Sequence, residues 1–284
     1  MRIDAHQHFW RYDAREYGWI DDSMAGLRRD FLPEDSRREM TRAGFDACVA
    51  VQARQTIQET RWLLALAESN PFIAGVVGWV DLQAPDVRAR LEQFAAHPKL
   101  VGVRHIVQSE PDDRFLLGPE FGRGLALLEK LGLAYDLLIY CRHLPVATEL
   151  AGRFGGQRFV LDHLAKPDVR GGEIRAWSAD LRKLAACPNV WCKLSGLVTE
   201  ADWAAWKPEH LRPYLDVAFD CFGADRLMIG SDWPVCTVAS DYARTMAVIM
   251  EYVADRPARD RDGVLGGNAQ RFWNLPTVST AGTE

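Results

Sequence analysis

The stretch RIDAHQHFW, residues 2–10, decides between two fold classes. It begins with a short apolar run, RIDAH (2–6), and continues into a polar and aromatic turn. A doubly wound open sheet would more often carry a glycine-rich phosphate turn directly after its first strand. This turn contains no glycine. The stretch therefore favours a closed barrel, provided that the rest of the chain supplies the strands.

Seven further apolar runs follow along the chain, each after a segment of helical character. They are rich in Val, Ile and Leu, as strands covered on both faces are. The eight runs are 2–6, 46–52, 72–80, 100–107, 133–140, 158–163, 189–196 and 225–232. Several of the helical segments end at Gly or just before Pro, as helices commonly do. Alternating strands and helices predict a parallel sheet, and eight such units predict a single (β/α)8 barrel.

The barrel is expected to occupy residues 1–275 as one domain. Residues 276–284 form a short polar tail, which is expected to fray. The first connection, residues 9–35, is long for a loop inside a compact domain. It contains the aromatic residues Trp10, Tyr12, Tyr17 and Trp19. A long aromatic connection of this kind predicts a lid or cover rather than a linker.

Charge and composition exclude several classes of function. The net charge is −5 and the isoelectric point is about 5.8, which argues against a general binder of nucleic acids or anionic membranes. The sequence has no basic tract, and its N-terminus lacks the apolar core of a secretion signal. The six cysteines are scattered without a CxxC pair. We therefore expect a cytoplasmic protein with reduced thiols that acts on a small molecule.

Histidines and one aspartate stand at the predicted carboxyl ends of three strands. In a (β/α)8 barrel the active site forms at that end. The first run ends in His6 and His8, and residues two apart in a strand point the same way, so both imidazoles can converge. The sixth run ends at His163 and the eighth at Asp232. We predict that these four side chains form one catalytic site.

Three imidazoles and one carboxylate allow two kinds of chemistry. They could hold one divalent cation such as zinc, which takes nitrogen and oxygen ligands. They could also form a metal-free site, in which Asp232 accepts a proton from water and His6, His8 and His163 polarise a carbonyl. The residue types and their spacing leave both readings open.

The motifs at these strand ends resemble the amidohydrolase superfamily. They are IDAHQHFW (3–10), LDHLAKP (161–167) and IGSDWP (229–234), with further similarity in YGWIDDSM (17–24), GVVGWVDL (75–82), GVRH (102–105) and CKLSGL (192–197). Within the superfamily the chain resembles the amidohydrolase-related lactonases, and among these most closely the bacterial L-fuconolactonases. The resemblance runs from about residue 2 to residue 275. It implies a carboxylic-ester hydrolase that opens a sugar-acid lactone, with Asp232 activating water.

The chain departs from the metal-dependent members at two strand ends. Those members use a carboxylated Lys or a Glu after strand four and a His after strand five. Here strand four supplies Arg104 and His105, and strand five supplies Tyr140, with His143 three residues further on. The bridging ligand of a two-metal centre is therefore missing. One zinc held by His6, His8, His163 and Asp232 remains an option. Because the lactonase branch includes members that need no metal, whether the site binds a metal and whether catalysis requires it are separate questions.

The remaining strand ends carry residues that suit a polyol substrate. We predict substrate contacts from Gln52, Trp79, Arg104, His105, Tyr140 and Lys166. A dicarboxylate substrate would require several Arg side chains, and only Arg104 can be placed in the site. A neutral sugar lactone is therefore favoured over a pyrone dicarboxylate. The alternative function on the same barrel is a metal-dependent decarboxylase or a pyrone-type lactonase.

Overall fold

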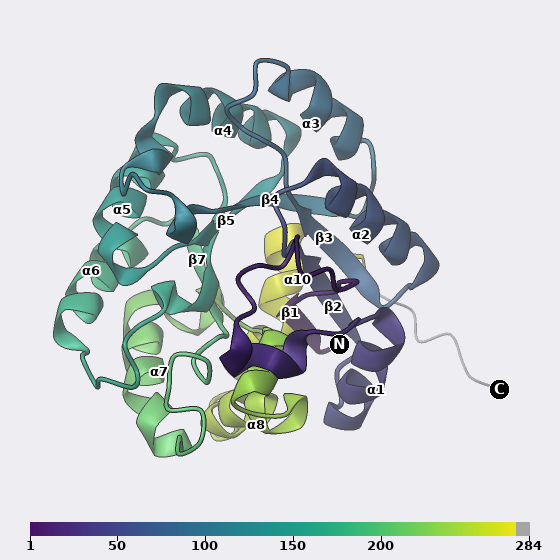
Figure 1. The fold of residues 1–284 in the computed structure, drawn as a ribbon. Coiled ribbons are helices and arrows are strands. Elements are labelled where there is room, and N and C mark those ends of the chain that lie inside the picture. The colour runs from purple at the N-terminus through teal and green to yellow at the C-terminus, as the bar shows by residue number, and fades with distance from the viewer. Residues whose placement is uncertain (277–284) are drawn as a thin grey trace.

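The fold is a single (β/α)8 barrel, as predicted. The structure is a computed structural model in which residues 1–276 are described (Figure 1). Eight strands pair in parallel in the order of the sequence, from β1 to β8. They are β1 Ile3–Gln7, β2 Ala47–Val51, β3 Ile73–Gly78, β4 Leu100–Ile106, β5 Ala134–Leu138, β6 Phe159–Leu161, β7 Val190–Leu194 and β8 Leu227–Ile229. Each lies within one of the predicted runs or extends it by a single residue. The predicted tail lies outside the described residues, except for Pro276.

Helices surround the strand ring on its outside. They are α1 Pro33–Ala43, α2 Ile57–Ser69, α3 Val87–Ala95, α4 Pro119–Leu131, α5 Leu144–Arg153, α6 Arg175–Ala185, α7 Pro208–Phe222, α8 Tyr242–Tyr252, α9 Ala258–Asp262 and α10 Asn268–Trp273. Gly44 and Gly132 end α1 and α4 in the left-handed conformation, at φ 76° and 69°. Glycine adopts this conformation without a steric penalty, so the C-terminal ends of both helices follow from the sequence. Among the described residues no helix has the length and apolar character needed to cross a membrane.

The ring closes between the end of β1 and the residues that follow β8. Gln7 and Trp233 form a parallel bridge, and the His8 backbone N–H donates to the Trp233 carbonyl at 2.7 Å. The Asp232 N–H donates to the His6 carbonyl at 2.8 Å. The Asp4 carboxylate reinforces the seam because it accepts from the backbone N–H and the hydroxyl of Ser231, at 2.9 and 2.6 Å. Closure therefore brings the His6–His8 segment against Asp232.

Two apolar clusters fill the barrel and its surroundings. One lies between the strands and the outer helices. The other contains interior strand residues such as Ile3, Val49 and Val160, together with Phe272 and Trp273 of α10. In Figure 1 this helix (yellow) lies behind the ring, and the first connection (purple) lies in front of it. The core and α10 therefore occupy one end of the barrel and leave the other end for polar side chains.

The long first connection packs over the barrel as a cover. It contains a short helix, Asp22–Leu27, and Trp10 pairs by backbone hydrogen bonds with Phe31. The Trp10 ring lies 5.3 Å from Phe31 and 5.6 Å from Tyr17, measured between ring centroids. All three rings are buried. Aromatic burial therefore orders a connection that has little regular structure of its own.

The connection after β2 is held by a buried carboxylate. Glu59 accepts from the backbone N–H groups of Ala53 and Arg54 at 3.1 and 2.7 Å and is fully buried. Burial raises the pKa of Glu59 to about 7, because desolvation outweighs its hydrogen bonds and the charge of Arg54. The unfolded chain has the ordinary value near 4.5. Between these two values the folded state therefore holds one more proton than the unfolded state.

This excess proton makes stability fall as the pH rises. We expect the free energy of unfolding to decrease by about 3 kcal/mol between roughly pH 4.5 and pH 7, and to be independent of Glu59 above that range. Urea unfolding at several pH values measures this effect. In Glu59→Gln, whose side chain does not titrate, the slope over the same range should be correspondingly flatter. An identical pH dependence in the two proteins would contradict the assignment.

Candidate active site

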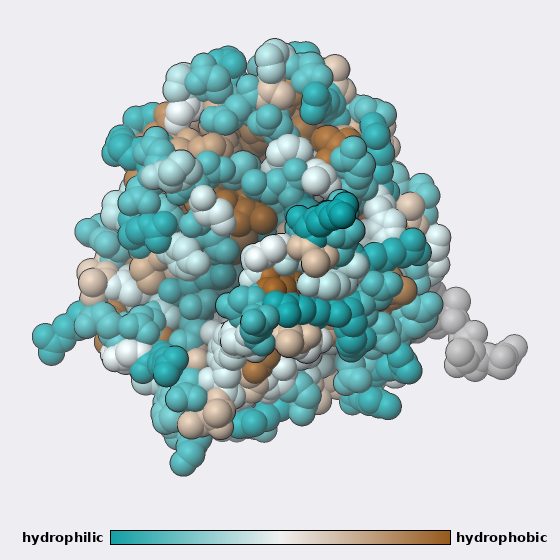
Figure 2. All heavy atoms as spheres, in the orientation of Figure 1, coloured by the Kyte–Doolittle hydropathy of each residue, from teal (hydrophilic) through white to brown (hydrophobic). Residues whose placement is uncertain are grey.

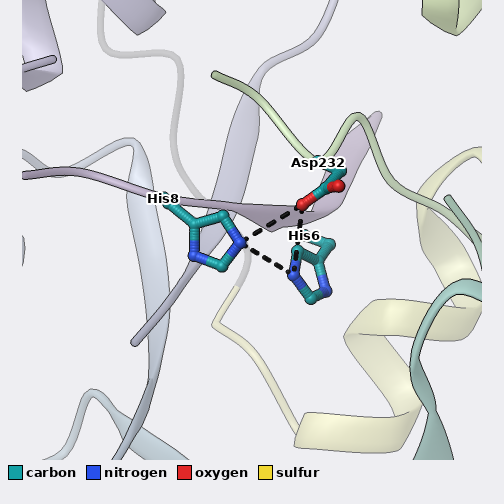
Figure 3. Close-up of side chains that lie close together, drawn as sticks. All are labelled: His6, His8 and Asp232. Atoms are coloured by element: carbon teal, nitrogen blue, oxygen red, sulfur yellow. Dashed lines mark hydrogen bonds and ion pairs between the residues drawn. The ribbon is translucent and has the colours of Figure 1, made fainter. Parts of the chain in front are cut away.

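His6, His8 and Asp232 meet at the seam between β1 and β8, as predicted (Figure 3). The Nε2 atoms of the two histidines lie 3.2 Å apart. His8 Nε2 lies 3.2 Å from Asp232 Oδ1, and His6 Nε2 lies 3.8 Å from the same oxygen. His6 is completely buried, whereas His8 and Asp232 are each 5% exposed. His6 therefore lies beneath the other two.

His163 joins them from the end of β6 through an unusual turn. His163, Leu164, Ala165 and Lys166 all have positive φ, between 52° and 60°. This conformation is costly for residues with a Cβ, and such strain gathers at functional sites. The turn is held by Trp177 Nε1, which donates to the Leu164 carbonyl at 2.7 Å. It places His163 Nε2 at 3.9 Å from Asp232 Oδ1 and brings Lys166 to the same cavity.

Gly196 and Ser195, which follow β7, define the space around His163. A Cβ at position 196 would lie 2.6 Å from His163 Nδ1, and Gly196 has a φ of 70°. Only glycine meets both requirements. Ser195 Oγ lies 2.8 Å from His163 Nδ1 and fixes the ring by a hydrogen bond. Burial lowers the pKa of His163 to about 4, so the imidazole is neutral at neutral pH.

Asp232 is ionised at neutral pH. Burial opposes the charge, but the nearby His163, the hydrogen bond from His8 and the neighbouring His6 outweigh it, and the pKa of Asp232 lies well below its usual range. Asp232 also has a left-handed backbone, with φ 57°. This conformation directs the carboxylate at the three imidazoles. The site therefore contains a carboxylate that can accept a proton at any pH above the acidic range.

The donor set fits a single divalent cation. His6, His8 and Asp232 form one group with ligand atoms close enough for a metal, and His6, Asp162 and His163 form another. His8 Nδ1 lies 2.8 Å from the Val51 carbonyl and donates to it, so Nε2 is the ring nitrogen that would offer a lone pair to a bound metal. Tetrahedral zinc ligands about 2.05 Å from the metal lie about 3.3 Å from one another. The two 3.2 Å separations match that spacing.

A buried charge network lies beneath the histidines. Arg104 NH1 donates to Asp162 Oδ2 at 2.9 Å and lies 3.3 Å from His6 Nε2. Lys193 Nζ lies 2.5 Å from Asp136 Oδ2, 2.9 Å from Asp162 Oδ1 and 3.1 Å from His6 Nδ1. Burial and the charge of Lys193 together keep the pKa of His6 well below its usual value. The imidazole of His6 is therefore neutral.

A cavity of about 410 Å³ opens above these groups. Six of the predicted site residues line it: His8, Arg104, Tyr140, His163, Lys166 and Asp232. Lys166 Nζ lies 3.9 Å from Glu200 Oε1 and 5.6 Å from the centre of the Tyr140 ring. Figure 2 shows this face of the molecule as largely hydrophilic, with hydrophobic residues exposed near its centre. The cavity therefore combines charged groups with apolar walls.

Three predicted substrate contacts lie elsewhere. Gln52 is completely buried below the cavity, where its Oε1 accepts from Arg104 NH2 at 3.2 Å. His105 faces outward from β4, because neighbouring residues of a strand alternate and Arg104 faces inward. Its ring stacks on Phe115 at 4.6 Å, and Trp79 Nε1 donates to its Nδ1 at 3.3 Å. Gln52 supports Arg104, whereas Trp79 and His105 belong to packing outside the barrel.

Several residues of the cavity wall were not predicted from the sequence. The cavity walls also contain Trp19, Met24, Gln108, Glu200 and Trp203, which come from connections. The Oε1 atom of Gln108 is buried and has no hydrogen-bond partner in the described part of the chain. Burial raises the pKa of Glu200, partly offset by Lys166. Gln108 and Glu200 are therefore polar groups placed to accept hydrogen bonds from a bound molecule.

Comparison with known proteins decides the family. The family described as Amidohydrolase matches residues 3–275. The chain belongs to the amidohydrolase family. This membership confirms the resemblance seen in the strand-end motifs and covers nearly all of the residues assigned to the barrel.

Close relatives of this amidohydrolase are named for one activity. A protein of Burkholderia multivorans named L-fucono-1,5-lactonase is 42% identical over 99% of this chain and 98% of its own length. A protein of the same name from Burkholderia ambifaria is 41% identical, over 98% and 97%. A crystal structure of an amidohydrolase from Burkholderia multivorans with bound zinc has a TM-score of 0.94 at 42% identity, covering 97% of this chain and 100% of that one. The resemblance to the lactonase branch is thereby confirmed.

Proposed function

We propose that this amidohydrolase is a lactonase that hydrolyses a sugar-acid lactone, with L-fucono-1,5-lactone as the leading substrate. The two relatives that carry this name match almost the full length of the chain. The observation that carries the chemistry is the ionised Asp232 in a cavity wall shared with His8, His163 and Arg104. A base beside hydrogen-bond donors is what attack of water on a carbonyl requires.

Asp232 acts as the general base in this proposal. It accepts a proton from water while the water oxygen bonds to the lactone carbonyl carbon. The ring C–O bond then breaks, and Asp232 returns the proton to the leaving alkoxide. One water is consumed and an open-chain hydroxy acid is formed. General-base catalysis of this kind contributes about 10²–10⁴-fold to the rate.

Arg104 and His163 stabilise the oxyanion of the tetrahedral intermediate. Both line the cavity, and Arg104 is held rigidly by Asp162 and Gln52. A preorganised donor of this kind contributes about 10²–10³-fold. His6 lies beneath them and acts as a positioning residue, because it is buried and does not line the cavity. His8 orients Asp232 from the side.

A divalent metal would be held by His6, His8 and Asp232, with His163 nearby. When bound, zinc would supply Lewis-acid polarisation of the carbonyl oxygen. Arg104 and His163 contact the cavity independently of it. Binding of a metal and dependence on a metal are therefore measured separately, the first by metal content and the second by activity after chelation.

Glu200, Lys166 and Gln108 bind the hydroxyl groups of the sugar. We expect Glu200→Gln to raise the KM for L-fuconolactone about tenfold with little change in kcat, because a charge-assisted hydrogen bond is lost away from the reacting carbonyl. Steady-state rates of proton release measure both constants. The exposed Glu209→Gln on α7 serves as the matched control. A fall in kcat with KM unchanged would place Glu200 in the chemical step instead.

Proton release from a panel of lactones tests the proposed function. The panel contains L-fucono-, L-rhamnono-, L-galactono- and D-arabinono-lactones, each assayed with untreated and with chelator-treated enzyme. Rapid release from L-fuconolactone supports the proposal. No release from any lactone contradicts it. Carbon dioxide from aromatic acids, lost on chelation, would establish the decarboxylase alternative.

A further inference from the structure

Two cavity residues, His163 and Lys166, stand at the two ends of the left-handed turn formed by residues 163–166. All four residues of this turn have positive φ. Residues three apart in a helical turn lie on the same side of it, and this holds for either hand. His163 and Lys166 both line the cavity, whereas Leu164 and Ala165 between them are completely buried. The left-handed conformation therefore brings an imidazole and an ammonium group to the same wall.

The left-handed turn needs support from outside. Each of its four residues has a Cβ, which this conformation brings too close to the following carbonyl oxygen. The penalty, repeated four times, exceeds what one hydrogen bond offsets. Within the turn, the Lys166 N–H donates to the His163 carbonyl at 2.7 Å. Pro167 disfavours the right-handed helical conformation for Lys166, so a released turn would extend and carry Lys166 away from His163.

Trp177 of α6 supplies one outside donor. Its Nε1 donates to the Leu164 carbonyl at 2.7 Å. Trp177 is 3% exposed, and its ring lies 5.3 Å from that of Tyr214 on α7, measured between centroids. Packing between two helices therefore fixes the position of the indole. Because Leu164 is completely buried, water cannot replace this donor once it is removed.

Cys141, which follows Tyr140 beyond the end of β5, supplies a second donor. Its Sγ lies 3.3 Å from the Ala165 carbonyl oxygen and 3.3 Å from that of Lys166, so the two oxygens share one thiol hydrogen. Burial raises the pKa of the Cys141 thiol to about 11, so the sulfur keeps its hydrogen at neutral pH. The contact joins the turn to the residue next to Tyr140, whose ring centre lies 5.6 Å from Lys166 Nζ.

We propose that Trp177 and Cys141 are positioning residues, which hold residues 163–166 left-handed so that His163 faces the lactone carbonyl while Lys166 faces the sugar hydroxyls. Neither residue lines the cavity, so each acts through the backbone of the turn. The inference rests on the proposed function, which assigns His163 to the oxyanion and Lys166 to the substrate. Loss of the indole donor should change kcat and KM together, because both ends of the turn are released.

Trp177→Phe tests the indole donor because it keeps an aromatic ring and removes the N–H. We expect kcat on L-fuconolactone to fall about tenfold and KM to rise several-fold. The matched control is Trp206→Phe, since Trp206 is equally buried and its Nε1 donates to the Ala239 carbonyl at 2.9 Å. It should lose similar stability and keep both constants within twofold. Native constants in Trp177→Phe, or equal losses in the two variants, contradict the proposal.

A glycine in the turn tests the conformation itself. Glycine adopts the left-handed region without a steric penalty, so a turn with Ala165→Gly depends less on outside donors. Adding Trp177→Phe to Ala165→Gly should therefore lower kcat at least threefold less than adding it to the native chain. An equal or larger loss would mean that Trp177 acts by some other route than the backbone conformation, which overturns the proposal.

Two substitutions at Cys141 test the thiol donor. Cys141→Ala and Cys141→Ser both remove the sulfur, and only serine restores a hydrogen-bond donor. We expect the KM for L-fuconolactone to rise several-fold in Cys141→Ala and to lie closer to the native value in Cys141→Ser. Cys221→Ala, at a half-buried cysteine of α7, should leave the KM unchanged. Equal KM values in the alanine and serine variants contradict a donor role for Cys141.

Hydrogen exchange at the Lys166 N–H reports on the turn without an activity assay. This N–H is protected while it donates to the His163 carbonyl. We expect exchange to be roughly tenfold faster in Trp177→Phe than in the native chain, and unchanged in Trp206→Phe. If the native chain opens no lactone, the proposed function fails and exchange still tests the support of the turn. Native exchange in Trp177→Phe would overturn that support, whatever the activities are.

Discussion

Asp232→Asn is expected to reduce kcat on L-fuconolactone by about 10²–10⁴-fold, because the general base is removed. The loss should be confined to kcat, since Asn has the same shape and the cavity wall is kept. Asn is also suited to the backbone here, because Asn and Asp tolerate the left-handed region better than other residues with a Cβ. Position 232 has a φ of 57°. Proton release under saturating lactone measures the effect.

An exposed aspartate provides the control for this substitution. Asp220→Asn on α7 removes a charge from a solvated helix face and should leave kcat within twofold of the native value. If Asp232→Asn retains more than about a tenth of the native kcat, general-base catalysis by Asp232 is wrong. The thermal unfolding temperature of Asp232→Asn is measured alongside its activity. If that temperature falls, kcat is compared at a temperature where both proteins are folded.

The second large effect is expected at Arg104. Arg104→Met should lower kcat/KM by about 10²–10³-fold through the lost oxyanion donor. It should also destabilise the fold by about 3–5 kcal/mol, because Asp162 loses a buried partner. Arg104 is 3% exposed, and its guanidinium contacts Asp162 and Gln52 together. Urea unfolding and steady-state kinetics measure the two losses separately.

Arg104→Lys distinguishes geometry from charge. A lysine keeps the positive charge but cannot reach both partners in the planar geometry of a guanidinium. We expect it to recover part of the stability and little of the kcat/KM. Arg88→Lys, on the exposed face of α3, is the matched control and should change neither. Native activity in Arg104→Lys would show that charge alone is sufficient and would contradict the assigned donor geometry.

The strands and the cluster of His6, His8 and Asp232 could be predicted because both follow from short-range rules. Apolar runs of strand length, separated by helices, define the barrel, and barrels place functional groups at the carboxyl ends of strands. His6, His8 and Asp232 were found in this way and lie within hydrogen-bond or ion-pair distance of one another. His163 also lies where expected, although its left-handed turn has no sequence signature in LDHLAKP.

The layer beneath the cluster was missed although the sequence contains a signal for it. Asp136 lies in AYDLL and Lys193 in VWCKL, so each is a charged residue inside an apolar strand. Charged side chains are rarely buried unless they are paired. Two such residues of opposite charge in nearby strands indicate a pair inside the barrel. The pairing with Asp162 and His6 requires the closed ring, which no local pattern specifies.

The cavity walls could not be predicted in the same way. Gln108, Glu200 and Trp203 come from connections, whose conformation is not set by hydrophobic periodicity. Trp79 and His105 were expected at the site because they lie near strand ends. Strand alternation turns His105 outward. The backbone N–H of Trp79 donates to Thr60 Oγ1 at 2.8 Å, which holds this residue against α2. A position near a strand end is therefore a weaker predictor of a site residue than a side chain that faces into the barrel.

A single-turnover reaction in ¹⁸O-labelled water tests the central claim most directly. Enzyme in excess over L-fucono-1,5-lactone is quenched, and the sugar acid and the peptide that contains Asp232 are analysed by mass spectrometry, with the uncatalysed background taken from Asp232→Asn. The account predicts one ¹⁸O in the carboxylate of the sugar acid and none in the peptide, because water attacks the carbonyl directly. Unlabelled sugar acid with ¹⁸O in Asp232 would mean that the carboxylate is the nucleophile, and no sugar acid above background would mean that the protein is not this lactonase.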